Sequence, residues 1–148
     1  MEKKVMEIES PKGHVRKKRM LITGSTGLVG SYFSRLVNLK KKYDIYTAIH
    51  SEEQQQSSLA SSITFGKQIQ VDLSNSMDLF RQAINRVQPD IILHLAAMTD
   101  VDLCEIQRSI ANNINHLSVK ELVNYTANAN NNKECFILHV STDYVFDG

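Results

Sequence analysis

Near the start of this chain the sequence reads Arg19-Met20-Leu21-Ile22-Thr23-Gly24-Ser25-Thr26-Gly27-Leu28-Val29-Gly30, and this stretch predicts a strand, a turn and a helix in succession. The apolar run at its beginning indicates a short buried strand. The glycines that follow indicate a tight turn. Apolar residues then recur at helical spacing, namely Val29, Tyr32, Phe33, Leu36 and Val37. A glycine turn in this context is typical of a phosphate-binding motif.

The glycine turn offers two features that suit a pyrophosphate. The first N–H groups of a helix lack partners inside the helix, and the helix dipole adds partial positive charge there. We expect Gly24 to allow the turn, Gly27 to let phosphates approach the backbone, and Gly30 to let the helix pack close to the strand. The spacing Gly-x-x-Gly-x-x-Gly differs from the commonest dinucleotide fingerprint, and no Walker-type Gly-Lys-Ser/Thr follows. A plain tight turn is the alternative interpretation.

The length and composition limit the class of protein. The chain has 148 residues, of which 42% are hydrophobic and 22% charged, as in a soluble globular domain. Its net charge of +1 does not favour a nucleic-acid-binding surface. Cys104 and Cys135 form no Cys-x-x-Cys pair, and the start of the chain has no apolar signal segment, so we expect a cytoplasmic protein. No apolar run approaches membrane-spanning length.

The order of elements predicts the fold class. Residues 1–18 are polar and basic and are expected to form a mobile tail before a single domain at 19–148. Further strands are predicted at 44–49, 68–71, 90–97 and 136–140. One intervening helix has Asn75 as its cap, Pro89 after its end and a buried stripe of Met77, Phe80, Ile84 and Val87. A longer helix is expected from Ile106 onward, with Ile106, Ile110, Ile114 and Leu117 on one face. Strands alternating with helices predict an α/β doubly wound parallel sheet.

Polar residues follow several of these strands and should meet at one edge of the sheet. The segments concerned are 24–30, Asp72, 96–99 and 141–143. His94, inside an apolar strand, is expected to be a hydrogen-bonded core residue. The segment from Met98 to Glu105 is expected to be a loop whose carboxylates are solvated or cap a helix, and no metal site is predicted.

These motifs carry a resemblance to a known family. The chain is similar to the N-terminal half of an extended short-chain dehydrogenase/reductase, and within that superfamily it most resembles the dTDP-4-dehydrorhamnose reductase family. The motifs are the segment 23–30, Asp72-Leu73, the segment 95–102, Asn115, and Ser141-Thr142-Asp143-Tyr144-Val145-Phe146-Asp147-Gly148, of which the last is the most specific. The resemblance covers residues 19–148 and implies a Rossmann-like, NAD(P)-binding domain.

The resemblance also implies roles for matching residues. Those assigned to the cofactor are Gly24, Thr26, Gly27, Leu28, Val29, Gly30, Asp72, Leu73, Ala97, Met98, Thr99 and Val140. Among them, the glycine turn would lie under the pyrophosphate, Asp72 and Leu73 would border the adenine, and the others would line the ribose and nicotinamide.

The resemblance also implies roles for residues that would contact the substrate. Thr142 matches the catalytic hydroxyl that hydrogen-bonds the substrate carbonyl, and Asp143 matches a substrate contact. Asn115 matches a helix asparagine associated with active-site order, although its side chain would also suit bonds to nearby backbone alone.

The implied activity is reduction of a nucleotide-linked 4-keto-6-deoxysugar with NADP or NAD. The second strand ends at His50 and Ser51, which does not decide between the two cofactors. The family's Tyr-x-x-x-Lys pair does not occur in the sequence, so we expect a truncated, cofactor-binding half whose open edge favours a homo-oligomer or a covering partner. A regulatory protein resembling the methionine adenosyltransferase beta subunit, and a nucleotide-sugar epimerase or dehydratase, remain alternatives.

Overall fold

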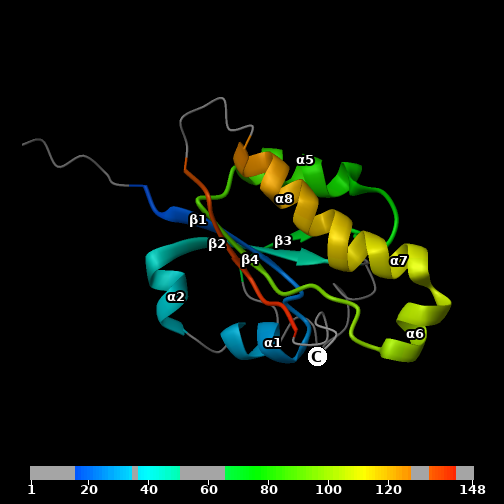
Figure 1. Cartoon of the computed structure of the whole chain (residues 1–148). Coiled ribbons are helices and arrows are strands. Elements are labelled where there is room, and N and C mark those ends of the chain that lie inside the picture. Colours follow the sequence, from blue (N-terminus) through cyan, green and yellow to red (C-terminus); the bar gives the residue numbers. More distant parts are fainter. Residues whose placement is uncertain (1–15, 35–36, 51–65, 128–133, 143–148) are drawn as a thin grey trace, which may run out of the picture.

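The central feature of the fold is one parallel sheet. The computed structural model describes residues 16–34, 37–50, 66–127 and 134–142. Within these ranges, five strands form the sheet in the order β3-β2-β1-β4-β5 (Figure 1). They are β1 (Lys18–Thr23), β2 (Tyr43–Ile49), β3 (Lys67–Gln70), β4 (Ile91–His94) and β5 (Phe136–His139). The strand order reverses beside β1, which confirms the predicted doubly wound sheet.

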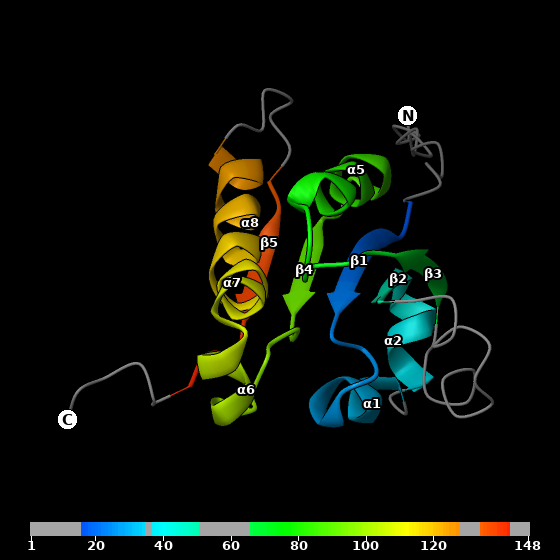
Figure 2. The same ribbon diagram turned by 90° about the vertical axis from the view of Figure 1, so that its right-hand side faces the viewer.

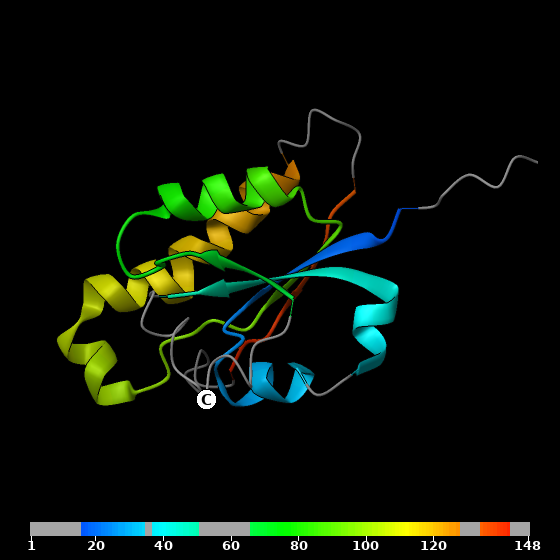
Figure 3. The same ribbon diagram turned by 180° about the vertical axis from the view of Figure 1, so that it is seen from behind.

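Helices cover both faces of this sheet. The helices α5 (Met77–Val87) and α8 (Ser118–Ala127) lie on one face, and α1 (Leu28–Ser34) and α2 (Val37–Lys42) lie on the other (Figures 1 and 3). Between β4 and α8 the chain forms α6 (Val101–Ile106), α7 (Arg108–Asn112) and a π-helical turn, η1 (Asn113–Leu117), as Figure 2 shows from another side.

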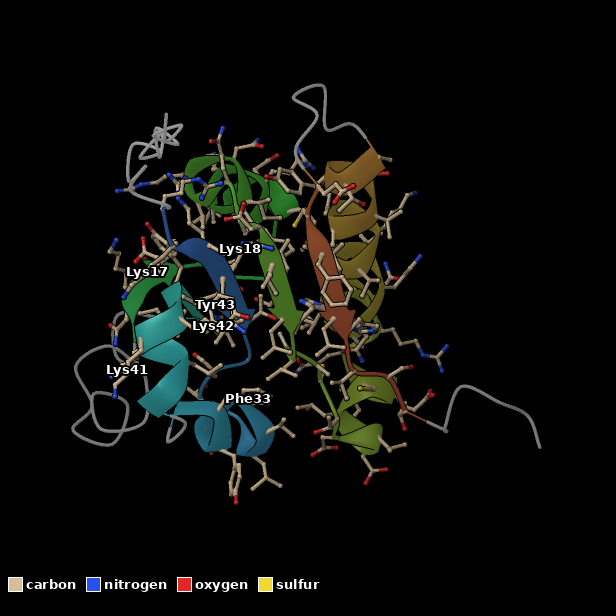
Figure 4. The ribbon with its side chains drawn as sticks, turned by 90° about the vertical axis from the view of Figure 1, so that its left-hand side faces the viewer. Lys17, Lys18, Phe33, Lys41, Lys42 and Tyr43 are labelled. Atoms are coloured by element: carbon tan, nitrogen blue, oxygen red, sulfur yellow. The ribbon has the colours of Figure 1, made fainter. Side chains whose placement is uncertain are left out.

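Alternate residues of β1 supply two hydrophobic cores, as expected for a strand covered on both faces. Leu21 packs into the cluster that contains Phe80 of α5 and Leu122 of α8. Ile22 packs into the opposite cluster, against which Phe33 of α1 lies (Figure 4). The predicted buried stripe of α5 is confirmed, since Met77, Phe80, Ile84 and Val87 are all buried.

An acidic residue before β4 holds the start of β1. The carboxylate of Asp90 accepts two hydrogen bonds from the Arg16 guanidinium, at 3.0 and 2.9 Å, and one from the Arg19 N–H at 2.7 Å. The Asp90 N–H in turn donates to the Arg19 carbonyl at 2.9 Å. Residues 1–15 of the predicted tail lie outside the described residues, whereas Arg16 is tied to this contact.

The structure corrects several predicted boundaries. Ser76, rather than Asn75, caps α5, because its hydroxyl accepts from the Asp78 N–H at 3.1 Å. The segment expected to be a loop before Ile106 contains α6, which Asp100 caps by accepting from the Leu103 N–H at 2.9 Å. Because the helix breaks after Ile106, that side chain is 78% exposed rather than part of the apolar face.

The outer strand β5 is apolar but poorly covered. Phe136 is 66% exposed and Leu138 49% exposed. Figure 4 shows α2 in front of the β1–β2 side of the sheet and α1 beyond the end of β1, whereas no helix of the described part of the chain lies in front of β5. This apolar stripe is the least covered part of the sheet.

Candidate functional site

A cavity of about 270 Å³ opens at the carboxyl ends of β1 to β4. Of the residues predicted for the cofactor, it is lined by Gly24, Thr26, Gly27, Asp72, Leu73 and Ala97. The remaining lining residues are Thr23, Ala48, His50, Val71, Ser74, Leu95, Ala96 and Ile114. The topology therefore brings the glycine turn and the polar strand ends together around one space.

Gly24 and Gly30 are required by the packing of the turn itself. Gly24 has a φ of 65°, and a Cβ there would lie 2.6 Å from the Ala96 nitrogen. At Gly30 a Cβ would overlap the Gly24 carbonyl and lie 2.6 Å from the Ser25 Cα. Gly24 thus lets the turn lie against the end of β4. Gly30 lets α1 pack on the turn, rather than on the strand as the sequence suggested.

Gly27 differs from its two neighbours in the motif. A Cβ there would meet only the Gly24 carbonyl oxygen, at an ordinary contact distance of 3.4 Å. Its N–H donates to the same carbonyl at 3.1 Å, and its own carbonyl accepts from the Ser31 N–H at 2.8 Å. Gly27 is exposed and lines the cavity. A Cβ at this position would therefore meet no clash within the protein.

Asp72 forms the polar part of the cavity beside β3. Its carboxylate accepts from the Ser74 N–H at 2.8 Å and from the Ser74 hydroxyl at 2.5 Å, and His50 Nδ1 lies 3.5 Å from it. Burial raises the pKa of Asp72, but the Ser74 hydrogen bonds and the charge of His50 outweigh it, so this pKa lies below its ordinary value. An ionised carboxylate therefore stands at this wall, with an imidazole next to it.

The chain after β4 is held by an amide side chain. Asn115, in η1, accepts from the Met98 N–H at 2.8 Å and donates to the Met98 carbonyl at 3.0 Å. Asn115 thus bonds backbone that is distant in the sequence, not the adjacent helix backbone. These two bonds fix the loop that begins with Ala97.

Other predicted residues lie outside the cavity lining. They are Leu28, Val29, Gly30, Met98, Thr99, Val140 and Thr142. Leu28 is 91% exposed, and Thr142, just after β5, is exposed as well. Asp143 lies outside the described residues.

Thr23 acquires a larger structural role than the sequence indicated. Thr23 is buried, and its hydroxyl oxygen accepts from the Leu95 and Ala96 N–H groups, each at 3.2 Å. These bonds join the glycine turn to the end of β4, which stops at His94 although the strand was predicted to run to 97. His94 is fully buried and hydrogen-bonded, as expected. A hydroxyl immediately before the first glycine was the available signal for Thr23.

The doubly wound sheet, its glycine turn and the cavity over the strand ends define a Rossmann-like domain of the NAD(P)-binding class. Within the described ranges, none of the helices is both long and apolar enough to cross a bilayer. The chain belongs to the family named RmlD substrate binding domain, whose model matches residues 18–148.

Comparison with known proteins gives similarities of the same kind. The chain is 32% identical over 130 residues to dTDP-4-dehydrorhamnose reductase from Aggregatibacter actinomycetemcomitans, covering 88% of this chain and 36% of that protein. It is 30% identical over 139 residues to methionine adenosyltransferase 2 subunit beta from Pongo abelii, covering 91% of this chain and 35% of that protein. The crystal structure of dTDP-4-dehydrorhamnose reductase from Bacillus anthracis with NADP superposes with a TM-score of 0.63 at 27% identity, covering 92% of this chain and 40% of that one. The chain thus spans little more than a third of the curated relatives it matches.

Proposed function

We propose that this chain binds a nicotinamide dinucleotide, NADP or NAD, across the carboxyl edge of its sheet. The observation that carries the proposal is the open space around Gly27 in the cavity lining. The protein itself would accept a Cβ there, so the packing of the turn does not account for this glycine, and its place in the cavity lining supports a role in ligand binding. Phosphate oxygens that approach the backbone of a helix start need such an opening.

The rest of the cavity suits the adenosine part of such a ligand. Ala48, Val71 and Ala96 give small apolar walls for a flat ring, and Asp72 gives an acceptor for ribose or base N–H and O–H groups. The cavity is near the lower end of small-ligand volumes, which run from about 300 to 1,000 Å³. The nicotinamide half would then lie over the more open ends of β4 and β5, near Thr99 and Val140.

The full protein's reaction is proposed from its family. A nicotinamide cofactor supplies hydride when bound, and the relatives act on dTDP-4-dehydrorhamnose according to their names. We assign this chain to a reductase of nucleotide-linked 4-keto-6-deoxysugars. Thr142 would orient the substrate carbonyl by a hydrogen bond, and Asp143 would contact the sugar.

Titration of the 148-residue chain with NADH and NADPH tests the binding proposal. We expect weak binding of both, with affinities within about tenfold of each other, because the described residues place neither an arginine nor an acid at the end of β2. Gly27→Asp should abolish binding, since it places an anion where the pyrophosphate lies. Gly27→Ala fills less of the cavity and serves as the matched control for folding. Absence of binding by the folded wild type, or retained binding in Gly27→Asp, would refute the proposal.

A second candidate is a regulatory subunit without reductase activity. The similarity to methionine adenosyltransferase 2 subunit beta, over 91% of this chain, favours it. Cofactor binding is compatible with both candidates. The discriminating assay is reduction of a dTDP-4-keto-6-deoxysugar by the product of the complete coding sequence, with Thr142→Ala as the inactive control. Turnover favours the reductase, whereas copurification with a synthetase and no turnover favours the regulatory subunit.

A further inference from the structure

A continuous chain of hydrogen bonds runs through the protein from one wall of the cavity to another. Thr23 Oγ1 lies 2.8 Å from His94 Nδ1, and His94 Nε2 lies 3.0 Å from Ser118 Oγ. The Ser118 hydroxyl donates to the Ile114 carbonyl at 2.6 Å. Thr23 and Ile114 both line the cavity, but His94 and Ser118 do not. Two fully buried polar side chains therefore connect walls that lie on different elements.

The proton positions along this chain follow from counting donors. The Ser118 hydroxyl has one hydrogen and gives it to Ile114, so it can only accept from His94, whose Nε2 must carry the proton. In a neutral imidazole Nδ1 is then an acceptor, and Thr23 donates to it. The two acceptor sites of the Thr23 hydroxyl oxygen face the N–H groups of Leu95 and Ala96, and the Leu95 N–H is shared with the Thr23 carbonyl at 3.3 Å.

The last bond of the chain lies at the end of the π-helical turn. The Ser118 N–H donates to the Asn113 carbonyl, five residues back, instead of to Ile114, four residues back. The Ile114 carbonyl instead accepts from the Ser118 hydroxyl. The same turn carries Asn115, which holds Met98. The π-helical turn and the chain around the end of β4 are thus linked twice, by the His94–Ser118 bond in the core and by the Asn115–Met98 bonds at the surface.

We propose that His94 is a positioning residue for the nucleotide cavity: in its Nε2–H form it fixes the wall made by Thr23 and Ala96 relative to the wall made by Ile114. This role rests on the cofactor binding proposed above. A histidine that only filled core volume would need neither a particular tautomer nor a bond to the π-helical turn. A second proton on the ring would require Thr23 to accept a third hydrogen bond, and its oxygen has acceptor sites for two.

The first test reads the tautomer directly. A long-range ¹H–¹⁵N spectrum of the ¹⁵N-labelled 148-residue chain at pH 7, without ligand, should show His94 protonated at Nε2 only. Protonation at Nδ1, or a ring that exchanges between both forms, would overturn the proposal, because Nε2 would then be an acceptor and the single Ser118 hydroxyl hydrogen could not serve both His94 and Ile114.

The second test separates positioning from helix stability. Ser118→Ala removes the link, whereas Thr126→Ala, the matched control, removes a hydroxyl that donates to the Val123 carbonyl at 2.9 Å in the same helix without reaching the cavity. We expect Ser118→Ala to raise the Kd for NADPH about threefold to tenfold and Thr126→Ala to leave it within about twofold. If Ser118→Ala does not fold by circular dichroism, Ser118→Cys, of similar volume and weaker hydrogen bonding, replaces it with the same expectation.

Each outcome has a defined meaning. An unchanged Kd in the folded Ser118 variant, or an equal rise in Thr126→Ala, would overturn the positioning role while leaving cofactor binding intact. Absence of NADH and NADPH binding in the wild type would instead refute the proposed function, and the positioning role with it.

Discussion

Acidification should destabilise this protein through His94 before it affects most carboxylates. Burial, and secondarily the charge of His139, lower the pKa of His94 from 6.5 to about 4. The unfolded chain therefore binds more protons than the folded one between these two values, so stability is complete above pH 6.5 and falls as the pH drops toward 4. The pKa values differ by about 2.5, and at 1.36 kcal/mol for each pKa unit the loss is about 3 kcal/mol.

The assay is urea denaturation at a series of pH values between 7 and 4, followed by circular dichroism. The variant His94→Gln cannot titrate, so the difference between its pH dependence and that of the wild type isolates the histidine. Asp72, whose pKa is lowered in the folded state, loses its contribution mainly at the acid end of this range, and it is present in both proteins, so it cancels from their difference. Parallel free-energy curves for the two proteins between pH 6.5 and 4, or an NMR titration of His94 near its ordinary pKa, would refute the reasoning.

Three further predictions concern stability and association. Gly30→Ala should lower the free energy of unfolding by about 1–3 kcal/mol, because the added Cβ overpacks the turn. Gly27→Ala should change the free energy of unfolding by less than about 1 kcal/mol. Urea denaturation in which Gly27→Ala is the more destabilising of the two would contradict the assigned contacts. Asp90→Ala should cost about 1–3 kcal/mol, because the Arg19 N–H loses a charged acceptor, and hydrogen exchange at Arg19 should accelerate. Phe136→Lys should reduce concentration-dependent association, measured by light scattering, because the side chain is 66% exposed on an edge strand. The melting temperature should change little. Unchanged scattering would show that this strand does not mediate the association.

The sequence predicts elements well where local signals agree. The helix α5 has an apolar stripe, a cap and a proline after its end, and all of its predicted buried residues are buried. Its cap was misplaced by one residue, since Asn75 and Ser76 are both good caps. The Asn75 carbonyl accepts from the Asn113 side chain at 2.9 Å, a contact that depends on the folded structure.

The segment between β4 and β5 was harder to predict because tertiary contacts shape it. A single helix from Ile106 was expected, whereas the chain forms α6, α7, η1 and α8. The π-helical turn coincides with Asn115, whose bonds to Met98 span 17 residues of sequence. A pattern based on helical periodicity contains no signal for such a bond.

The candidate site was predictable in outline for a similar reason. Glycine spacing and polar strand ends locate the edge of the sheet, since topology alone brings these ends together. Separate roles for the three glycines were expected, but the atoms that crowd Gly24 and Gly30 were not predictable, because they belong to Ala96 after β4 and to the turn itself. Likewise, Thr23 looks like an ordinary strand residue until β4 lies beside it.

The central position of β1 sets the order in which this protein can be completed during synthesis. β1 cannot pair with β4 until β4 has been synthesised, and Asp90, just before β4, follows Arg19 by 71 residues. At roughly 5–20 residues per second, the ribosome needs roughly 4–14 s to supply them. Throughout that interval one edge of β1 is unpaired and Gly24 lacks the backbone of Ala96 against which it packs. The cavity therefore cannot form before β4 is made, and a nucleotide bound there as proposed would stabilise the finished sheet without guiding the early steps of folding.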